Sequence, residues 1–213
     1  VEFVDMAVRK HSQYFYSVVS VDKEGKESSK SEFGKPIVFG EKTKVVYLTF
    51  DDGPSQYTSQ ILNILDSYGV KATFFVKNGG KYNYLMKDIV NRGHAIGLHT
   101  YSHDYKKIYS SEEAFFADMS AIRKLIAKYT PDVTPLFRFP GGSSNTISQL
   151  YNRGIMTRLA KALTEMGYTY FDWNVDSDDA GKAKTTAEVY KNVIGNVGYA
   201  PYSIVLQHDT KEC

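Results

Sequence analysis

The chain has 213 residues, 42% of them hydrophobic, which is enough to bury a core as one domain or as one domain plus part of another. Its net charge is +2 without a long basic run, which excludes a typical nucleic-acid-binding surface. The single cysteine, Cys213, excludes a disulfide framework and a cysteine metal site, and no apolar run is long enough to cross a membrane.

The first 35 residues differ in composition from the rest of the chain. Tyr14–Val21 is rich in aromatic and β-branched residues, which predicts a strand, and Asp22–Lys26 is typical of a turn. This order resembles the closing hairpin of a fibronectin type III module, and a β extension of the main domain is the alternative. We expect residues 1–35 to form such a segment, Gly34–Pro36 to be a linker, and residues 36–213 to form the main domain.

From Lys44 onward, short apolar runs alternate with segments of helical periodicity. The runs predicted as buried strands are Val45–Phe50, Ala72–Val76, His94–Leu98, Leu136–Phe137, Tyr168–Phe171 and Ser203–Leu206. The segments predicted as helices are Ser55–Ser67, Tyr82–Asn91, Ser111–Lys128, Ser148–Met166 and Thr186–Asn196. This alternation predicts an α/β fold in which helices cover a parallel sheet. Polar clusters follow these strands at their C-terminal ends, the edge at which such folds gather their catalytic residues.

The first cluster, Asp51-Asp52-Gly53-Pro54, directly follows a predicted strand. Adjacent carboxylates repel, and each raises the pKa of the other. A cation would resolve the conflict for one carboxylate and leave the other free to act as a base. The alternative is a simple turn, because Asp-Gly-Pro is favourable turn sequence.

The second cluster contains His99 and His103, after the strand that ends at Leu98. Two imidazoles at this spacing can face one ion, although such pairs also occur by chance. Together with Asp52 they would supply two nitrogens and one oxygen and leave positions open for water and substrate, which is the catalytic pattern. Zinc is the default ion for such a site, with Co²⁺ or Mn²⁺ as alternatives.

Three further clusters occur later in the chain. Arg138 precedes Gly141 and Gly142, an arrangement that could hold a carboxylate and offer backbone N–H groups to an oxyanion. Asp172 precedes the only tryptophan, and His208 follows the last predicted strand. Taken singly, each of these features also fits an ordinary loop or a core residue.

Together and in this order, the five clusters closely resemble those of the NodB-type polysaccharide deacetylases, carbohydrate esterase family 4. The resemblance runs from about Lys44 to Asp209 and depends on the combination of clusters. It implies a distorted, incomplete (β/α) barrel. It also implies a metal-dependent hydrolase that removes N-acetyl groups from amino-sugar glycans.

The resemblance assigns catalytic roles to four residues. Asp51 would be the general base, oriented by Arg138, and would take a proton from the attacking water. His208 would be the general acid that protonates the departing amine, and Asp172 would tune its pKa.

The resemblance also assigns metal and substrate contacts. The metal ligands would be Asp52, His99 and His103. The backbone N–H of Gly141 would help to bind the oxyanion, and Trp173 and Leu206 would line the pocket for the acetyl methyl group.

Several positions depart from the family pattern. Asp104 and Phe139 stand where proline is usual, Gly141 replaces an aromatic residue, and Thr169 replaces an acidic one. The family also continues past its last histidine with a further helix and strand, whereas this chain stops at Cys213. We therefore expect a catalytic domain truncated at its C-terminus.

The expected substrate is a cell-wall polysaccharide, with peptidoglycan first and chitin oligomers or acetylxylan as alternatives. A fibronectin-like neighbour favours an exported bacterial enzyme that acts outside the cell or at the cell wall. The alternative from another class is a glycan-binding module that has lost activity. Loss of the base or of a metal ligand would favour this alternative, but all the proposed catalytic groups are present.

Overall fold

The computed structural model describes residues 12–14, 24–26, 37–39, 45–131 and 134–210. Residue contacts divide the chain into two units, Val1–Thr43 and Lys44–Cys213. In the first unit, β1 (Ser12–Tyr14) pairs antiparallel with β2 (Ile37–Phe39). The predicted strand Tyr14–Val21 lies outside the described residues except for Tyr14, so the fibronectin-like hairpin stays a prediction.

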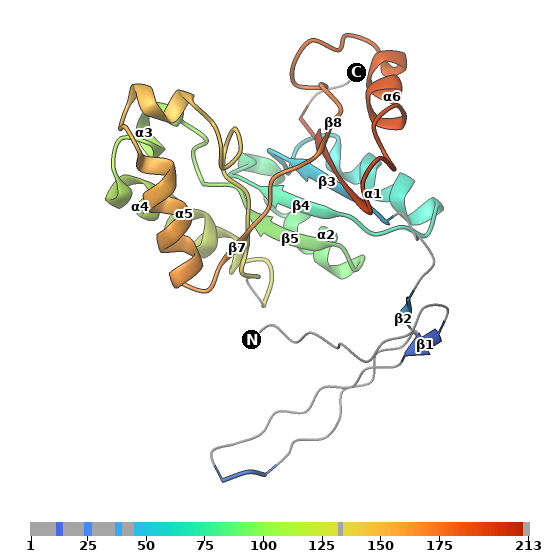
Figure 1. Ribbon diagram of the computed structural model, residues 1–213, viewed down its shortest axis with the longest axis horizontal. Helices are drawn as coiled ribbons and strands as arrows, with labels where there is room; N and C mark the ends of the chain where they lie inside the picture. The colour runs from blue at the N-terminus through green and yellow to red at the C-terminus, as the bar shows by residue number, and fades with distance from the viewer. Residues whose placement is uncertain (1–11, 15–23, 27–36, 40–44, 132–133, 211–213) are drawn as a thin grey trace. The chain divides into compact units, whose positions relative to one another are not determined.

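The second unit is built on seven parallel strands in the order β7-β6-β5-β4-β3-β9-β8 (Figure 1). They are β3 (Val45–Asp51), β4 (Thr73–Val76), β5 (Ala95–Leu98), β6 (Leu136–Phe137), β7 (Thr169–Tyr170), β8 (Val175–Asp176) and β9 (Tyr202–His208). The sheet curls into an incomplete (β/α) barrel, which confirms the predicted fold class. The register of β3 and β9 places Asp51 beside His208.

Helices accompany the strands along the chain. They are α1 (Thr58–Ser67), α2 (Leu85–Asn91), α3 (Tyr105–Ile108), α4 (Glu112–Ile126), α5 (Ile155–Glu165) and α6 (Thr186–Ile194), with short 3₁₀ turns η1 (Gly80–Tyr82) and η2 (Ile147–Leu150). Helices α4 and α5 pack together on the side of β5 to β7, whereas α6 lies beside β8 (Figure 1). None of the described helices is both long and apolar enough to span a membrane.

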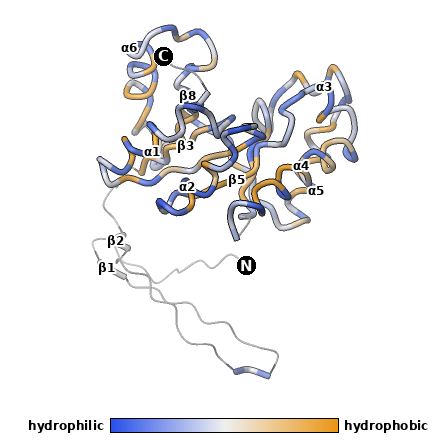
Figure 2. Tube along the Cα trace, turned by 180° about the vertical axis from the view of Figure 1, so that it is seen from behind, coloured by the Kyte–Doolittle hydropathy of each residue, from blue (hydrophilic) through white to orange (hydrophobic). Residues whose placement is uncertain are grey.

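The core forms where the apolar strands meet the apolar faces of α4 and α5 (Figure 2). The Phe115 ring of α4 lies 5.6 Å from the ring of Phe137 in β6 and 5.6 Å from that of Phe139. All three side chains are fully buried. Each such burial contributes about 1.5–3 kcal/mol, which fixes the ends of the strands on a rigid base.

One predicted element differs from the structure, and two observed elements were not predicted. The helix predicted over Ser148–Met166 starts too early, because α5 covers Ile155–Glu165 and Gly154 at φ +73° separates it from η2. Helix α3 was not predicted because it is a single turn, begun by the Asp104 side chain accepting from the N–H of Lys107. Strand β8 has only two residues and carries no periodicity that a sequence could reveal.

A cavity of about 440 Å³ lies on the inner side of the curled sheet. Its lining residues are Tyr47, Thr49, Thr73, Phe75, Leu136, Arg138, Phe171, Tyr202 and Ile204. Tyr47 and Tyr202 come early in β3 and β9, so the cavity extends toward the N-terminal ends of the strands. Arg138 is the one predicted site residue in this lining, and the other polar clusters follow the strands at their C-terminal ends.

Candidate metal and catalytic site

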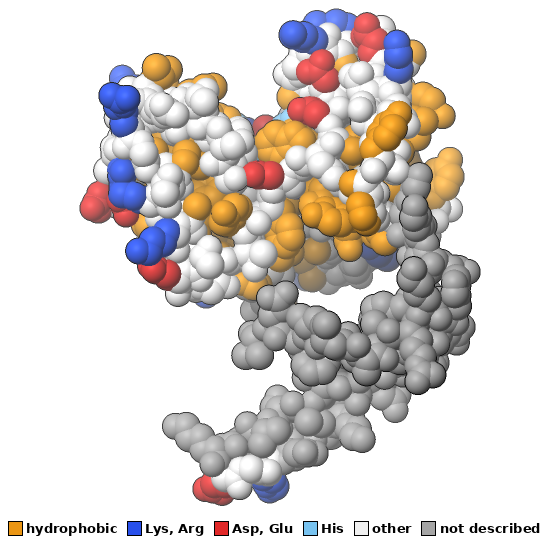
Figure 3. All heavy atoms as spheres, viewed as in Figure 1, with side chains coloured by type: hydrophobic (Ala, Val, Ile, Leu, Met, Phe, Trp, Pro, Cys, Tyr) orange, Lys and Arg blue, Asp and Glu red, His pale blue; other side chains and the backbone are white. Residues whose placement is uncertain are grey.

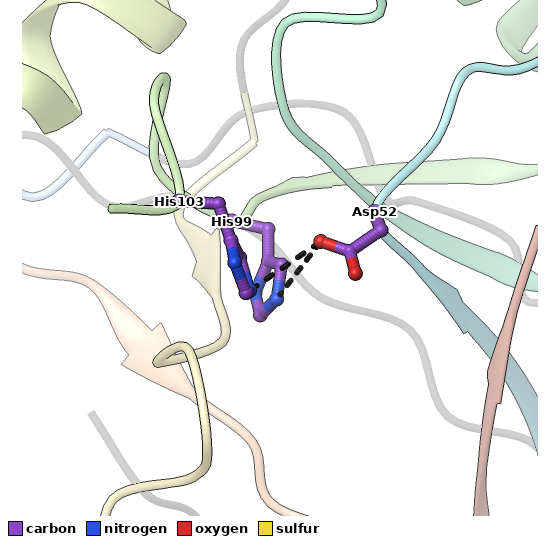
Figure 4. A group of neighbouring side chains, drawn as sticks. All are labelled: Asp52, His99 and His103. Atoms are coloured by element: carbon purple, nitrogen blue, oxygen red, sulfur yellow. Dashed lines mark ion pairs between the residues drawn. The ribbon is translucent and has the colours of Figure 1, made fainter. Parts of the chain in front are cut away.

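Asp52, His99 and His103 converge at the C-terminal ends of β3 and β5. One ligand atom from each side chain lies within 4.8 Å of the others. The two imidazoles face the Asp52 carboxylate across the gap between their loops (Figure 4), with His103 Nε2 3.4 Å and His99 Nε2 3.9 Å from Asp52 Oδ1. In the space-filling view, this face is hollowed between the lobe of α3 to α5 and that of α6, and a histidine is visible in the hollow (Figure 3).

The backbone around these ligands adopts unusual conformations. Asp52 has φ 71°, Thr100 has φ 69° and His103 has φ 54°, all in the left-handed region. A non-glycine residue in this region costs about 1–3 kcal/mol, and such residues concentrate at functional sites. The strained positions include two of the three candidate ligands, so the fold holds these side chains in place against local backbone preference.

His99 is prepared to act as a ligand through Nε2. Its Nδ1 lies 2.8 Å from the carbonyl oxygen of Arg138, so Nδ1–H donates there and leaves the Nε2 lone pair facing Asp52. Burial lowers the pKa of His99 to about 4. Burial, with the neighbouring His99, likewise lowers the pKa of His103 to about 4. Both rings are therefore neutral near pH 7, the form that binds a metal.

The Asp52 carboxylate fits the same interpretation. Burial alone would raise its pKa, but His99, His103 and Lys77 outweigh this effect and lower the pKa. Its Oδ1 is buried and receives no hydrogen bond from the described residues. The groups that face Oδ1 are the two imidazoles and the Lys77 ammonium at 3.5 Å. An ionised, buried oxygen beside two neutral imidazoles suits a divalent cation of the zinc type.

Asp51 lies next to this group in a different environment. Its Oδ1 accepts a hydrogen bond from Arg138 Nη1 at 2.9 Å, and Arg138 Nη1 also donates to Thr49 Oγ1 at 2.6 Å. Burial raises the pKa of Asp51 to about 6, although Arg138 and His208 act in the opposite direction. The carboxylate is therefore oriented and more basic than an exposed one, as a general base needs to be.

His208 completes the group from the end of β9, and its partner is Asp179. Nδ1 of His208 lies 2.8 Å from Asp179 Oδ1, while Asp179 Oδ2 accepts from the backbone N–H of His208 at 2.6 Å. Burial alone would lower the pKa of His208, but Asp179 raises it, with support from Asp51 and Asp52. His208 therefore retains its proton to higher pH than an ordinary histidine.

Asp179 was not predicted from the sequence, and the family resemblance assigned its place to Asp172. The structure corrects this, because the Asp172 carboxylate binds the hydroxyl and N–H of Ser143 instead. Asp179 follows β8, and the turn after β8 brings Asp179 toward the neighbouring strand β9. Had β8 been recognised as a strand, the rule that polar residues gather at strand ends would have pointed to Asp179.

The three predicted substrate-contacting residues lie near the C-terminal ends of β6, β7 and β9. The Gly141 N–H donates no hydrogen bond to the described residues, and its φ of +76° is in the glycine-favoured region. The Trp173 ring stands 5.6 Å from the Arg138 guanidinium. Leu206 is two residues before His208 in β9, so both side chains point to the same face of the sheet.

Comparison with known proteins gives consistent results. Residues 40–171 match the sequence model of a family described as polysaccharide deacetylase. A peptidoglycan-N-acetylglucosamine deacetylase of Bacillus cereus is 33% identical over 80% of this chain and 61% of its own length. A chitin deacetylase of Colletotrichum lindemuthianum is 32% identical over 84% of this chain and 72% of its own length.

A solved structure with the same fold is the catalytic domain of a peptidoglycan N-acetylglucosamine deacetylase from Eubacterium rectale. It is 48% identical, with a TM-score of 0.78 that covers 79% of this chain and 78% of that one. The chain spans 61%, 46% and 56% of the lengths of three of the curated relatives that it matches.

Proposed function

The chain belongs to the polysaccharide deacetylase family, and from this premise we propose that it hydrolyses N-acetyl groups on N-acetylglucosamine residues of peptidoglycan. The observation that carries the proposal is the group of Asp52, His99 and His103, with the basic carboxylate of Asp51 beside it. An acetyl amide resists attack by water near neutral pH, so its hydrolysis needs an electrophile, a base and an acid in one place.

Asp52, His99 and His103 would hold a divalent cation, with Zn²⁺ first and Co²⁺ or Mn²⁺ as alternatives. A cation bound there would polarise the acetyl carbonyl and lower the pKa of water. Two neutral imidazoles and one carboxylate leave a net charge of +1 on the complex, which favours the developing negative charge of the transition state.

Asp51 would take the proton from the attacking water. The hydrogen bond from Arg138 fixes the direction of one carboxylate oxygen, so the other, Oδ2, remains to accept the proton. Oδ2 lies 3.7 Å from His99 Nε2, on the side of the metal ligands. Arg138 thus acts by orienting the base, and it is itself fixed by the carbonyl groups of Phe171 and Asp172.

His208 would protonate the amine as the C–N bond breaks. Because Asp179 accepts from Nδ1, the proton available to the leaving group is on Nε2. The N–H of Gly141, which has no hydrogen-bond acceptor among the described residues, would donate to the oxyanion, and Trp173 and Leu206 would contact the acetyl methyl group. The products are acetate and a free amino sugar, formed without an acyl-enzyme.

The bacterial relatives support peptidoglycan as the substrate, because three of them carry that substrate in their names. This substrate implies action outside the cell or at the cell wall. Chitin oligomers are the second candidate, because the fungal relative named for chitin matches a larger share of this chain. Acetylxylan would use the same catalytic residues.

Acetate release from peptidoglycan, chitin oligomers and acetylxylan, measured side by side with added zinc, tests the proposal. We expect release from peptidoglycan, its loss on chelation, and its recovery with zinc. Asp51→Asn should lower the rate by about 10²- to 10⁴-fold, the usual contribution of a general base, while zinc affinity is retained. A folded, zinc-loaded protein that releases acetate from none of the polymers would favour the glycan-binding module instead.

A further inference from the structure

The loop that carries both histidines poses a structural problem. His99 follows β5 and His103 precedes α3, and the backbone between them passes through the left-handed region at Thr100. A short segment with unfavourable dihedral angles does not keep one conformation by itself. Some interaction from outside the loop has to hold the two imidazoles in a fixed relation.

Asp118 supplies such an interaction from helix α4. Its Oδ1 accepts hydrogen bonds from the backbone N–H groups of Tyr101 at 2.5 Å and Ser102 at 3.0 Å. These are two of the three residues between His99 and His103. The carboxylate therefore binds the middle of the loop, where a small backbone rotation would displace both ligands.

The position of Asp118 on α4 is unusual for an acidic residue. It lies on the buried stripe of the helix with Phe115, Met119 and Ile122, and its side chain is fully buried. A buried carboxylate without partners costs several kcal/mol, so its presence on a core-facing stripe requires specific bonds. The apolar neighbours also make α4 a rigid support for the loop.

The charge of Asp118 is matched on its second oxygen. Lys107 Nζ of α3 lies 3.1 Å from Oδ2. Burial alone would raise the pKa of Asp118, but the N–H groups of Ser102 and Tyr101 and the Lys107 ammonium lower it. The ionised carboxylate thus connects the loop with both α3 and α4, and bonds to an ionised acceptor are about twice as strong as neutral ones.

We propose that Asp118 is a positioning residue for the metal site, which holds the His99–His103 loop in the conformation that directs both imidazoles at Asp52. The proposal rests on the proposed function, because it takes these imidazoles to be metal ligands. Asp118 touches neither the ligand atoms nor Asp51, so it acts through the backbone of the loop alone.

The test compares zinc affinities of Asp118→Ala and Asp118→Asn with that of the full chain, by competition with a chromogenic chelator. Alanine leaves two N–H groups without an acceptor and should weaken zinc binding by about 10- to 100-fold, the usual effect of losing a partner that orients a ligand. Asparagine keeps a neutral acceptor but loses the charge, so we expect an intermediate loss of about 3- to 10-fold.

Ser203→Ala is the matched control. Ser203 Oγ is also a buried oxygen that accepts a backbone N–H, from Gly198 at 3.1 Å, but it lies at the start of β9, far along the strand from His208. We expect this variant to lose stability in thermal unfolding of the metal-free protein while its zinc affinity stays unchanged. The comparison separates loss of ligand geometry from general destabilisation.

The outcomes distinguish the two proposals. Wild-type affinity in Asp118→Ala, with destabilisation like that of Ser203→Ala, would overturn the role of Asp118 and leave the proposed function standing. If the alanine variant does not fold, wild-type affinity in Asp118→Asn overturns the role in the same way. A wild-type chain that binds no zinc refutes the metal site itself and with it the proposed function.

Discussion

At the scale of single residues, the site separates the properties of two adjacent carboxylates. Asp51 is buried and paired with one guanidinium, and burial raises its pKa to about 6. Asp52 faces His99, His103 and Lys77, and these groups lower its pKa despite burial. Two identical side chains therefore differ in acidity through their neighbours alone, which suits one to the proposed role of base and the other to that of metal ligand.

The Asp179–His208 pair leads to a prediction about pH dependence. Because Asp179 raises the pKa of His208, Asp179→Asn should lower that pKa. The acid form of His208 is then lost at lower pH, so the alkaline limb of the pH profile of kcat/KM should move toward acid. We expect the rate near pH 7 to fall by about 10- to 100-fold, part of the usual contribution of a general acid.

The measurement is acetate release across pH 5 to 10 at saturating zinc. Asp172→Asn is the matched control, because its carboxylate binds Ser143 rather than the histidine. An alkaline limb that stays in place in Asp179→Asn and moves in Asp172→Asn would reverse the assignment.

At the scale of elements, sequence patterns point to the residues of the proposed site more clearly than to the residues that support it. Asp51, His99 and Arg138 directly follow apolar runs. Each run predicts a buried strand, and the strand in turn places the next residue at its C-terminal end. Asp118 and Asp179 have no such signal. Asp118 lies on a helix face whose sequence pattern predicts core, and Asp179 follows a two-residue strand. Only three-dimensional contacts identify these two residues.

The connection between β9 and α1 leads to a prediction about stability. Asp209 Oδ2 accepts from Thr58 Oγ1 at 2.6 Å, whereas Oδ1 is buried and receives no hydrogen bond from the described residues. A Cβ on Gly53 would lie 2.3 Å from this carboxylate, so the space is tightly filled. Burial raises the pKa of Asp209 from 3.8 to about 6.

Because this pKa is raised on folding, the protonated Asp209 adds stability below about pH 4, and that stability is lost as pH rises through about 6. We expect Asp209→Asn to gain stability relative to wild type between pH 4 and 7, by up to about 3 kcal/mol, since one pKa unit corresponds to about 1.4 kcal/mol. Urea unfolding of the metal-free proteins at several pH values measures the difference.

Asp66→Asn on α1 is the control with the opposite sign. Desolvation alone would raise the pKa of Asp66, but Lys71 and Arg92 lower it, so its contribution is lost as pH falls. Relative to wild type, this variant should lose stability as pH rises. Parallel curves for Asp209→Asn and wild type would contradict the raised pKa.

At the scale of the whole molecule, the proposed catalytic groups all belong to one unit. Every residue of the site lies within Lys44–Cys213, and the family match begins at residue 40. The boundary expected at residues 35–36 stays a prediction, but β2 (Ile37–Phe39) pairs with β1, so we propose that the separate β segment includes β2 and that the catalytic domain follows it. The sequence indicates this division through a change in composition, but composition does not reveal which contacts cross a boundary.

Deletion of residues 1–39 tests this division. Because β3 begins at Val45 and none of the proposed ligands or catalytic groups precedes it, we expect zinc affinity and acetate release to stay within about twofold of the full chain. The same deletion with Asp51→Asn provides the inactive reference. A loss of more than about tenfold in zinc affinity would mean that the first unit stabilises the ligand loops, because compact units joined by a linker otherwise keep their own sites.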